Sequence, residues 1–243
     1  MKNKHIGILL GGMSAEREVS ITSGEAVYQA LTARGYRCTK IYVDRDIDRV
    51  LRQTPIDVAF IALHGTYGED GCIQGLLEIL GIPYTGSSVM ASALAMDKLK
   101  AKELFRLYNV PTPPYYCVGR DDAERVAEIH GSFGFPAFVK PRRAGSSVGA
   151  GRAKDIQELE SLVEQAGRFD DAILVERFVQ GREIAVGVLD GRALGAIEIV
   201  PSGGLYDYKS KYQKGQSEYH LPARLSPTRY KGVLNIAERA VRC

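Results

Sequence analysis

The sequence has little of several features that would assign it at once to a class of protein. Its 243 residues contain no tryptophan and four cysteines, which are Cys38, Cys72, Cys117 and Cys243. They form no CxxC pair, and such scattered thiols are typical of a reduced cytoplasmic protein rather than of a disulfide framework or zinc site. The longest apolar runs, such as residues 58–63, are far shorter than the ~20 residues of a membrane span.

The chain also has little net charge. Its 32 Lys and Arg residues against 29 Asp and Glu residues leave +3, which is too small to indicate nucleic acid as a partner. The apolar run at 6–10 is too short for a signal peptide, and the charged residues 16–18 follow it closely. We therefore expect a cytoplasmic globular protein that has neither nucleic acid nor a membrane as a partner.

The first part of the chain alternates between strand-like and helix-like patterns. Apolar runs at 6–10 and 57–63 predict strands, and residues 38–43 are expected to form a further strand between them. Between and after them, helical faces are expected near residues 27–31, 73–80 and 101–108 because apolar residues recur at i, i+3, i+4 and i+7. A capping-box pattern at 22–25 leaves the start of the first helix uncertain between Ser14 and Thr22. Uninterrupted apolar strands between helices favour a mostly parallel, covered α/β sheet over residues 1–110.

Three prolines within residues 111–114 predict a domain boundary, because they favour an extended link. The strands and helix expected beyond it, with the hairpin turn signal Asp190-Gly191, indicate an antiparallel-leaning α+β unit. We expect a central subdomain at 111–190 and the start of another, incomplete subdomain at 191–243. The predicted strands cover 137–140, 172–178, 183–189 and 193–200, and the predicted helix covers 156–166.

The last forty residues divide into a loop and a helix. Residues 202–221 are polar and rich in Gly and Tyr, and a structureless stretch of this length usually means function or disorder. Ser226-Pro227 is typical of an N-cap and first helical position. The helix that follows carries an apolar face from Tyr230 to Val241, and we expect this face to be incompletely covered. The C-terminal end should therefore be marginally stable, prone to aggregation and sensitive to proteases.

Two glycine-rich turns follow apolar strands. Gly11-Gly12 leads towards a helix, whose first amides favour an anion, but a purely structural turn is as compatible with the pattern. Neither GxGxxG nor GxxxxGK[ST] occurs, so dinucleotide and P-loop motifs are not supported. The second turn, at 145–149, lies five residues after Lys140 and suits a phosphate, although a mobile hairpin tip or a snorkelling lysine would also fit.

Further candidates lie in and after the 172–178 strand. Glu176 and Glu183 could accept from a ribose or an adenine, and Phe178 could stack on a base, unless the carboxylates merely pair with Arg177 or Arg182. Interleaved tyrosines and lysines at 206–212 suit a loop that closes over a small charged substrate better than single-stranded nucleic acid. His64, which precedes a glycine, is more often a turn or core histidine than a base.

Taken together, the motifs resemble those of one family, D-alanine–D-alanine ligase of the ATP-grasp superfamily. The matching stretches are residues 10–20, 62–65, 68–71, 83–87, 96–98, 139–141, 145–149 and 206–212. The resemblance covers essentially the whole chain. It implies an N-terminal parallel α/β domain followed by an ATP-grasp fold whose C-terminal subdomain is incomplete.

The resemblance also implies a reaction and a set of roles. ATP phosphorylates the carboxylate of one D-alanine, and the amine of a second attacks the acyl phosphate to give a dipeptide for peptidoglycan. Lys98, Lys140 and Ser147 would hold the phosphates, and Lys211 would lie near the transferred phosphoryl group. Glu176, Phe178, Val179 and Glu183 would bind adenosine. Glu16 and His64 would contact the first D-alanine, with Ser146 and Tyr212 as hydrogen-bond partners of Glu16.

The same resemblance sets limits. The family's Arg for the tetrahedral intermediate and its acidic and amide ligands for two Mg²⁺ (or Mn²⁺) ions would lie beyond Cys243, so no metal ligand is assigned. Tyr212 favours the dipeptide, because relatives that make D-alanyl-D-lactate depart from tyrosine there. The alternatives are a non-catalytic nucleotide-binding fragment and a D-alanine–D-lactate ligase. The family also suggests a homodimer.

Overall fold

The computed structural model describes residues 3–131, 133–203, 210–211, 213 and 215–243. They fall into two compact units, Met1–Asp97 and Lys98–Cys243. The predicted subdivision at residues 110 and 190 remains a prediction. Within the described part of the chain, no helix combines the length and the apolar character that crossing a membrane requires.

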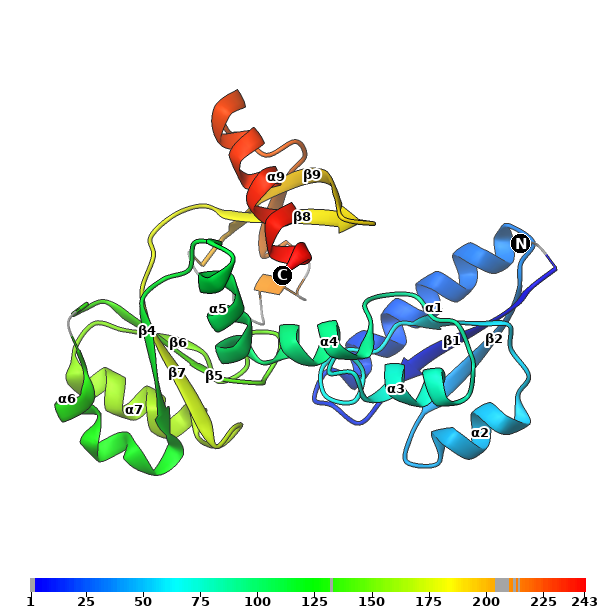
Figure 1. Ribbon diagram of the computed structural model, residues 1–243, viewed down its shortest axis with the longest axis horizontal. Coiled ribbons are helices and arrows are strands. Elements are labelled where there is room, and N and C mark those ends of the chain that lie inside the picture. The colour runs from blue at the N-terminus through cyan, green and yellow to red at the C-terminus, as the bar shows by residue number, and fades with distance from the viewer. Residues whose placement is uncertain (1–2, 132, 204–209, 212, 214) are drawn as a thin grey trace. The chain divides into compact units, whose positions relative to one another are not determined.

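The first unit is built on a parallel sheet with the strand order β2-β1-β3, of which Figure 1 labels β1 and β2. The central strand pairs with a neighbour on each side, and both pairings are parallel. This confirms the predicted parallel α/β architecture. The elements are β1 (His5–Gly11), α1 (Arg17–Ala33), β2 (Arg37–Val43), α2 (Ile47–Gln53), β3 (Val58–Ile61), α3 (Cys72–Ile79) and α4 (Val89–Met96).

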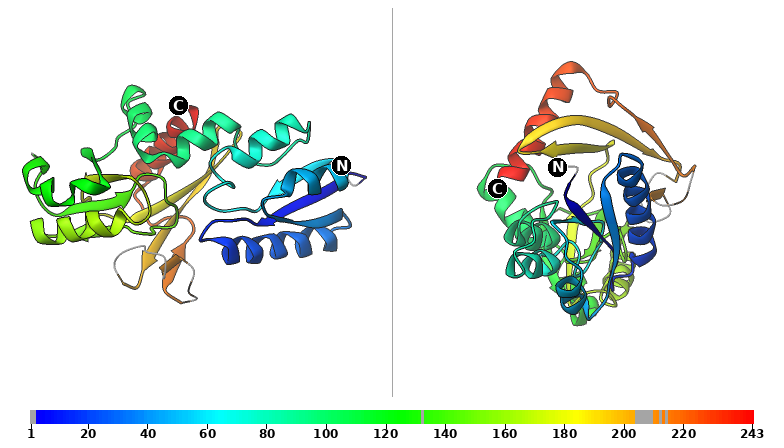
Figure 2. Two further views of the ribbon diagram at one scale, coloured as in Figure 1. Left: turned by 90° about the horizontal axis from the view of Figure 1, so that it is seen from below. Right: turned by 90° about the vertical axis from the view of Figure 1, so that its right-hand side faces the viewer.

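Alternate residues of β1 bury opposite faces of this sheet. Ile8 and Leu10 pack towards α1, whereas Leu9 packs with residues of α2 and α3. Figure 2 shows α1 running along one side of the strands. Helix and strand approach very closely at Gly24, where a Cβ would lie 2.6 Å from the Leu10 Cβ. Any larger residue at that helix position would force the two elements apart.

The second unit contains two antiparallel sheets, with the strand orders β4-β7-β5-β6 and β10-β9-β8. This confirms the predicted antiparallel character. The hairpin between β8 and β9 turns at Asp190 (φ 50°) and Gly191 (φ 73°), as their sequence predicts. The elements are α5 (Lys98–Leu107), β4 (Tyr115–Gly119), the 3₁₀ helix η1 (Arg120–Arg125), α6 (Val126–Ile129), β5 (Ala137–Pro141), β6 (Gly151–Ala153), α7 (Ile156–Ala166), β7 (Ala172–Arg177), β8 (Glu183–Leu189), β9 (Arg192–Pro201), β10 (Ser217–His220) and α9 (Pro227–Arg242).

The four-stranded sheet carries the apolar core of this unit. Helix α7 covers it with Leu159, Val163 and Ala166, all three completely buried. Their spacing on the helix is the predicted one. They pack on inward-facing residues of all four strands, including Val139 and Val175. Burial of this kind contributes about 25 cal/mol per Å² of apolar surface, so this layer stabilises the unit by apolar burial.

The three-stranded sheet is tied to its surroundings by polar contacts. The Glu198 side chain, 3% exposed, accepts hydrogen bonds from the Arg224 Nε (2.9 Å) and the Arg224 amide (3.1 Å). Helix α9 covers β8 and β9, and its Tyr230 hydroxyl accepts from the Ala196 amide at 3.1 Å. The same helix carries Glu238, which accepts from the Ala193 amide at 2.9 Å.

Helix α9 also contacts the end of α5. The Arg239 guanidinium donates from Nη2 to the carbonyl oxygens of Tyr108 (3.0 Å) and Asn109. Those carbonyls lie at the C-terminal end of α5, where a positive charge is favourable. The apolar face predicted for this helix therefore has strands beneath it, although none of its residues is fully buried.

Helix α1 begins at Arg17, within the range from Ser14 to Thr22 that the sequence left open, and the capping-box pattern at 22–25 lies inside it. Two local predictions are wrong. The stretch 202–221, predicted to be a loop, contains β10. On α5 the predicted face includes Tyr108, but the helix ends at Leu107, Tyr108 is exposed, and Lys102 is the buried side chain instead.

Candidate functional site

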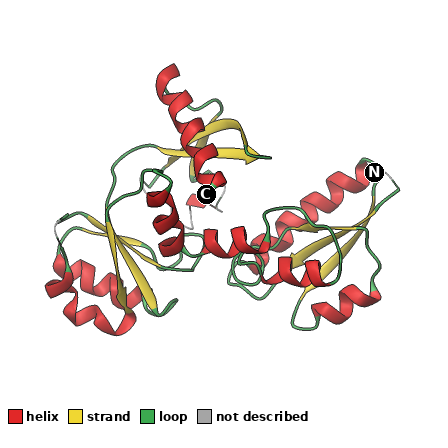
Figure 3. Ribbon diagram, in the orientation of Figure 1, coloured by secondary structure: helices red, strands yellow, loops and turns green. Residues whose placement is uncertain are grey.

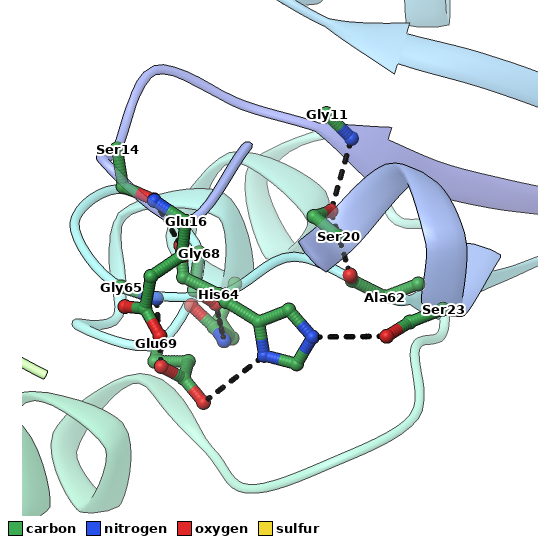
Figure 4. Close-up of polar contacts among 11 residues, drawn as sticks. Gly11, Ser14, Glu16, Ser20, Ser23, Ala62, His64, Gly65, Gly68 and Glu69 are labelled. Carbon is green, nitrogen blue, oxygen red and sulfur yellow. Dashed lines mark hydrogen bonds and ion pairs between the residues drawn. The ribbon is translucent and has the colours of Figure 1, made fainter. Parts of the chain in front are cut away.

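In the first unit, polar groups gather where β1 and β3 end (Figure 4). The Ser14 hydroxyl donates to the His64 carbonyl oxygen at 2.7 Å and accepts from the Glu16 amide at 3.1 Å. These two bonds join the segment after β1 to the segment after β3. Because parallel strands end at the same edge of a sheet, residues far apart in the sequence meet here.

Two carboxylates lie at the turn that follows His64. Glu16 is buried, and a Cβ at Gly65 (φ 68°) would lie only 2.7 Å from its Oε2. The Gly65 amide donates to Glu69 Oε2 at 2.7 Å. A glycine is therefore needed at this position both for its left-handed backbone and for the close approach of Glu16.

The His64 imidazole is held from two sides. Its Nε2 lies 3.2 Å from the Ser23 hydroxyl oxygen, and its Nδ1 lies 4.0 Å from Glu69 Oε1. The structure thus brings Glu16 and His64, which were predicted to contact substrate, into one cluster (Figure 4). Carboxylates beside an imidazole suit the ammonium group of an amino acid.

The Gly11-Gly12 turn does not offer its amides to a ligand. The Gly11 amide donates to the Ser20 hydroxyl at 2.9 Å, and that hydroxyl donates to the Ala62 carbonyl oxygen at 2.7 Å. The Gly12 amide donates to the Val43 carbonyl oxygen at 3.2 Å. Of the two interpretations of this turn, the geometry favours the structural one.

In the second unit, most of the predicted nucleotide-binding residues line a single cavity of about 460 Å³. Residues of β5 and the first residue of β8 line the cavity, and Figure 1 labels both strands. The cavity brings together lysines that can bind negatively charged groups, a glycine-rich turn, carboxylates and an aromatic ring. The predicted residues that line it are Lys98, Lys140, Ser146, Ser147, Glu176, Phe178, Val179, Glu183 and Lys211.

The turn at 145–149 has a backbone that is compatible with an anion-binding loop. Ser146 (φ 48°), Ser147 (φ 59°) and Gly149 (φ 67°) all adopt left-handed conformations. Two amide–carbonyl bonds, from Val148 to Gly145 (3.0 Å) and from Ala150 to Ser147 (3.2 Å), hold the turn. Concave turns of left-handed residues direct backbone amides towards anions. This geometry supports the phosphate interpretation over that of a hairpin tip.

Lys140 does not simply extend from its strand. Its ammonium lies 2.8 Å from Glu176 Oε1, and the Lys102 ammonium lies 3.1 Å from the same oxygen. Glu176 is buried, with 7% of its side chain exposed. The sequence left open a surface ion pair between Glu176 and Arg177. In the structure Glu176 instead pairs with two lysines, one from β5 and one from α5.

Lys98 also lies at the cavity, and its ammonium contacts the backbone. It donates to the carbonyl oxygens of Pro141 (3.1 Å), Arg142 (3.3 Å) and Ala144 (2.5 Å). These bonds join the first turn of α5 to the segment that leads into the glycine-rich turn. The position of the ammonium couples the turn to a rigid helix.

The apolar side of the cavity is formed around Phe178. Its ring centroid lies 6.3 Å from that of Phe138, and the Arg152 guanidinium carbon lies 4.5 Å from its centroid. Val179 is 64% exposed, and Glu183 begins β8 on an exposed position. An exposed apolar residue beside a ring and a carboxylate suits a planar base attached to a hydroxylated sugar.

One candidate residue lies outside the described part of the chain, and several residues near the sites were not predicted from the sequence. Tyr212 is not among the described residues. Among those that are, no group of three or more His, Cys, Asp or Glu side chains is arranged to hold a metal ion. Sequence reasoning missed Lys102, Arg152 and Glu69. For Lys102 the signal was its place four residues after Lys98 on one helix face.

The chain matches two family models, described as "D-ala D-ala ligase N-terminus" over residues 46–87 and "D-ala D-ala ligase C-terminus" over residues 104–243. It is 53% identical to the D-alanine--D-alanine ligase of Geotalea uraniireducens over 242 residues, which are 100% of this chain and 77% of that protein. The crystal structure of D-alanine--D-alanine ligase from Bacillus anthracis matches with a TM-score of 0.82 and 32% identity over 99% of this chain and 79% of that one. The ATP complex of that enzyme matches with a TM-score of 0.80 and 30% identity, over 98% of this chain and 76% of that one.

Proposed function

Because this chain belongs to the D-alanine–D-alanine ligase family, we propose that it joins two D-alanines into D-alanyl-D-alanine for peptidoglycan synthesis, with ATP as the energy source. The observation that carries the proposal is the cavity of the second unit, where three lysines, a left-handed turn and an apolar wall around Phe178 converge. Neither a D-alanine–D-lactate ligase nor a non-catalytic fragment is favoured by the relatives.

In the proposed complex, ATP lies in this cavity. Phe178 and Val179 contact the base, and the carboxylates of Glu176 and Glu183 accept from the adenine and the ribose. Lys98 and Lys140 hold the phosphates, and the 145–149 turn, with Ser147, closes over them. Lysine ammoniums placed against a transferring phosphoryl group stabilise the charge that spreads over its oxygens.

The first D-alanine would bind at the cluster of the first unit. The buried Glu16 carboxylate is proposed to hold its ammonium, with His64 beside it. A carboxylate oxygen of this D-alanine attacks the γ-phosphorus, the bond to ADP breaks, and an acyl phosphate forms near Lys211. The amine of the second D-alanine then attacks the acyl carbon and expels phosphate. Ser146 and Tyr212 are proposed to support Glu16.

Mg²⁺ (or Mn²⁺) is proposed to accompany ATP and to neutralise charge on its phosphates. Such ions prefer oxygen ligands, whereas the charged groups that the described wall offers near the glycine-rich turn are the lysines Lys98, Lys140 and Lys211. The described residues do not themselves form a metal site, so no step of the mechanism is derived through the ion. We further propose that the protein acts in the cytoplasm and as a homodimer.

The test is a ligation assay with ATP, Mg²⁺ and D-alanine. We expect dipeptide and phosphate in equal amounts, and Lys140→Ala should abolish both the activity and ATP binding measured by calorimetric titration. Unchanged ATP affinity in Lys140→Ala would refute the role of this lysine. ATP binding without turnover would identify the non-catalytic alternative, and faster reaction with D-lactate than with D-alanine would identify the other ligase.

A further inference from the structure

Glu176 is a buried carboxylate with two ammonium partners that differ in their surroundings. Its Oε1 lies 3.1 Å from the Lys102 Nζ and 2.8 Å from the Lys140 Nζ. The Lys102 side chain is 7% exposed, whereas the Lys140 side chain is 23% exposed and lines the cavity. Two lysines, one in the interior and one at the cavity, therefore share one carboxylate.

The Lys102 ammonium is fixed from several directions. Besides Glu176, it donates to the Thr112 hydroxyl and lies 4.8 Å from the centre of the Tyr115 ring. Burial lowers the pKa of the Lys102 ammonium, and the nearby Glu176 carboxylate opposes that change. The side chain has no part in lining the cavity. These contacts, to a carboxylate, a hydroxyl and an aromatic ring, are those of a structural cation held within the protein.

We propose that Lys102 is a positioning residue for the phosphate-binding Lys140. It acts as the resident counter-ion of Glu176, so that Lys140 can turn its ammonium towards a polyphosphate while the carboxylate stays paired. This inference rests on the ATP site assigned above and deepens it. It divides the two cations into one that stays and one that moves.

The energetics favour this division. A buried carboxylate that loses its only cation is left uncompensated, which is strongly unfavourable. With one lysine alone, binding of a phosphate would have to overcome that loss. With Lys102 in place the triad has a net charge of +1, and the positive excess is on the side chain that reaches the cavity. The arrangement makes phosphate affinity depend on a residue that never touches phosphate.

The test uses tripolyphosphate with Mg²⁺ as the probe, because it lacks the adenosine that Glu176 is proposed to contact. We expect Lys102→Met to weaken its binding about tenfold or more in calorimetric titrations, since Lys140 then remains held by Glu176. Lys100→Met is the matched control, on the same helix but exposed and paired with Glu103. It should bind tripolyphosphate as the wild type does.

The double variant Lys102→Met/Glu176→Gln separates positioning from mere structural support. Without the carboxylate charge Lys140 is released, so the double variant should return to within about threefold of Glu176→Gln alone. Equal losses in both backgrounds, or no loss in Lys102→Met, would overturn the inference.

If Lys102→Met does not fold, Glu176→Gln alone decides, because weaker tripolyphosphate binding by that variant contradicts the proposal. Wild-type chain that binds neither tripolyphosphate nor ATP would refute the proposed function as well, whereas normal wild-type binding with an unaffected Lys102→Met would refute this inference alone.

Discussion

The two sheets of the second unit are both antiparallel and both covered by a helix, yet they are held in different ways (Figure 3). Helix α7 buries Leu159, Val163 and Ala166 completely against the four-stranded sheet. Helix α9 has no fully buried residue, and its contacts with the three-stranded sheet include bonds from Tyr230 and Glu238 to backbone amides. One layer depends on apolar area, and the other on directional polar contacts.

This difference predicts how each layer responds to stress. Apolar burial adds up over a large area and does not depend on pH. A single hydrogen bond contributes only about 1 kcal/mol net, and ion pairs lose strength when a carboxylate is protonated. The region around β8, β9 and α9 should therefore open before the four-stranded sheet does. Matched substitutions in the two layers can test this.

The largest effect is expected for Leu159→Ala. The side chain is completely buried, so its truncation should lower the free energy of unfolding by about 2–5 kcal/mol. Leu234→Ala removes the same atoms from the half-buried face of α9 and should lower it by about 1 kcal/mol or less. Urea unfolding of both variants gives the comparison, and equal losses would show that the two layers do not differ.

A smaller effect is expected from acid acting on Glu198. The hydrogen bond from Arg224 lowers the pKa of Glu198 from its usual 4.5 to about 2. A carboxylate with a lower pKa in the folded state stabilises it above pH 4.5, and this contribution disappears as the pH falls towards 2. Glu198→Gln should lack that pH-dependent component.

The measurement is the free energy of unfolding between pH 6 and pH 2, taken as a difference between variant and wild type so that other carboxylates cancel to about first order. Glu218→Gln is the control, because that side chain is 79% exposed on β10. A wild-type profile that runs parallel to that of Glu198→Gln would remove electrostatics as the anchor of this sheet.

The smallest effect is expected for Tyr230→Phe. The substitution removes the hydroxyl that accepts from the Ala196 amide and should cost about 1 kcal/mol. We expect faster hydrogen exchange at β9 and faster limited proteolysis within 226–243, with α7 unchanged. Tyr219→Phe, at an exposed position of β10, should change neither. Resistance of α9 to proteolysis in every variant would contradict its proposed weakness.

How far the sequence predicted this structure depends on the range of the interactions. Apolar periodicity predicted the buried face of α7 correctly, because a helix that covers a sheet shows its pattern within a dozen residues. The strand β6 escaped prediction because it is three residues long, too short for a pattern to emerge. The burial of a polar residue is even harder to predict from the sequence, because the partner that permits it lies elsewhere in the chain.

The candidate sites illustrate the same limit. The turn at 145–149 could be predicted locally, and its left-handed residues fit an anion loop. The two lysines on Glu176 could not be predicted, because α5, β5 and β7 have to fold before they meet. Motif resemblance supplied the roles of Glu16 and His64, and the structure places both in one cluster. Their roles in binding remain predictions.

The bond from Arg239 to the end of α5 has a consequence for the order of events during synthesis. Tyr108 emerges from a ribosome long before Arg239, and 131 residues separate the two. At about 5–20 residues per second, the carbonyls at the end of α5 would stay exposed to water for on the order of ten seconds. The four-stranded sheet can form within that interval, whereas α9 can dock onto its layer only after the interval has passed.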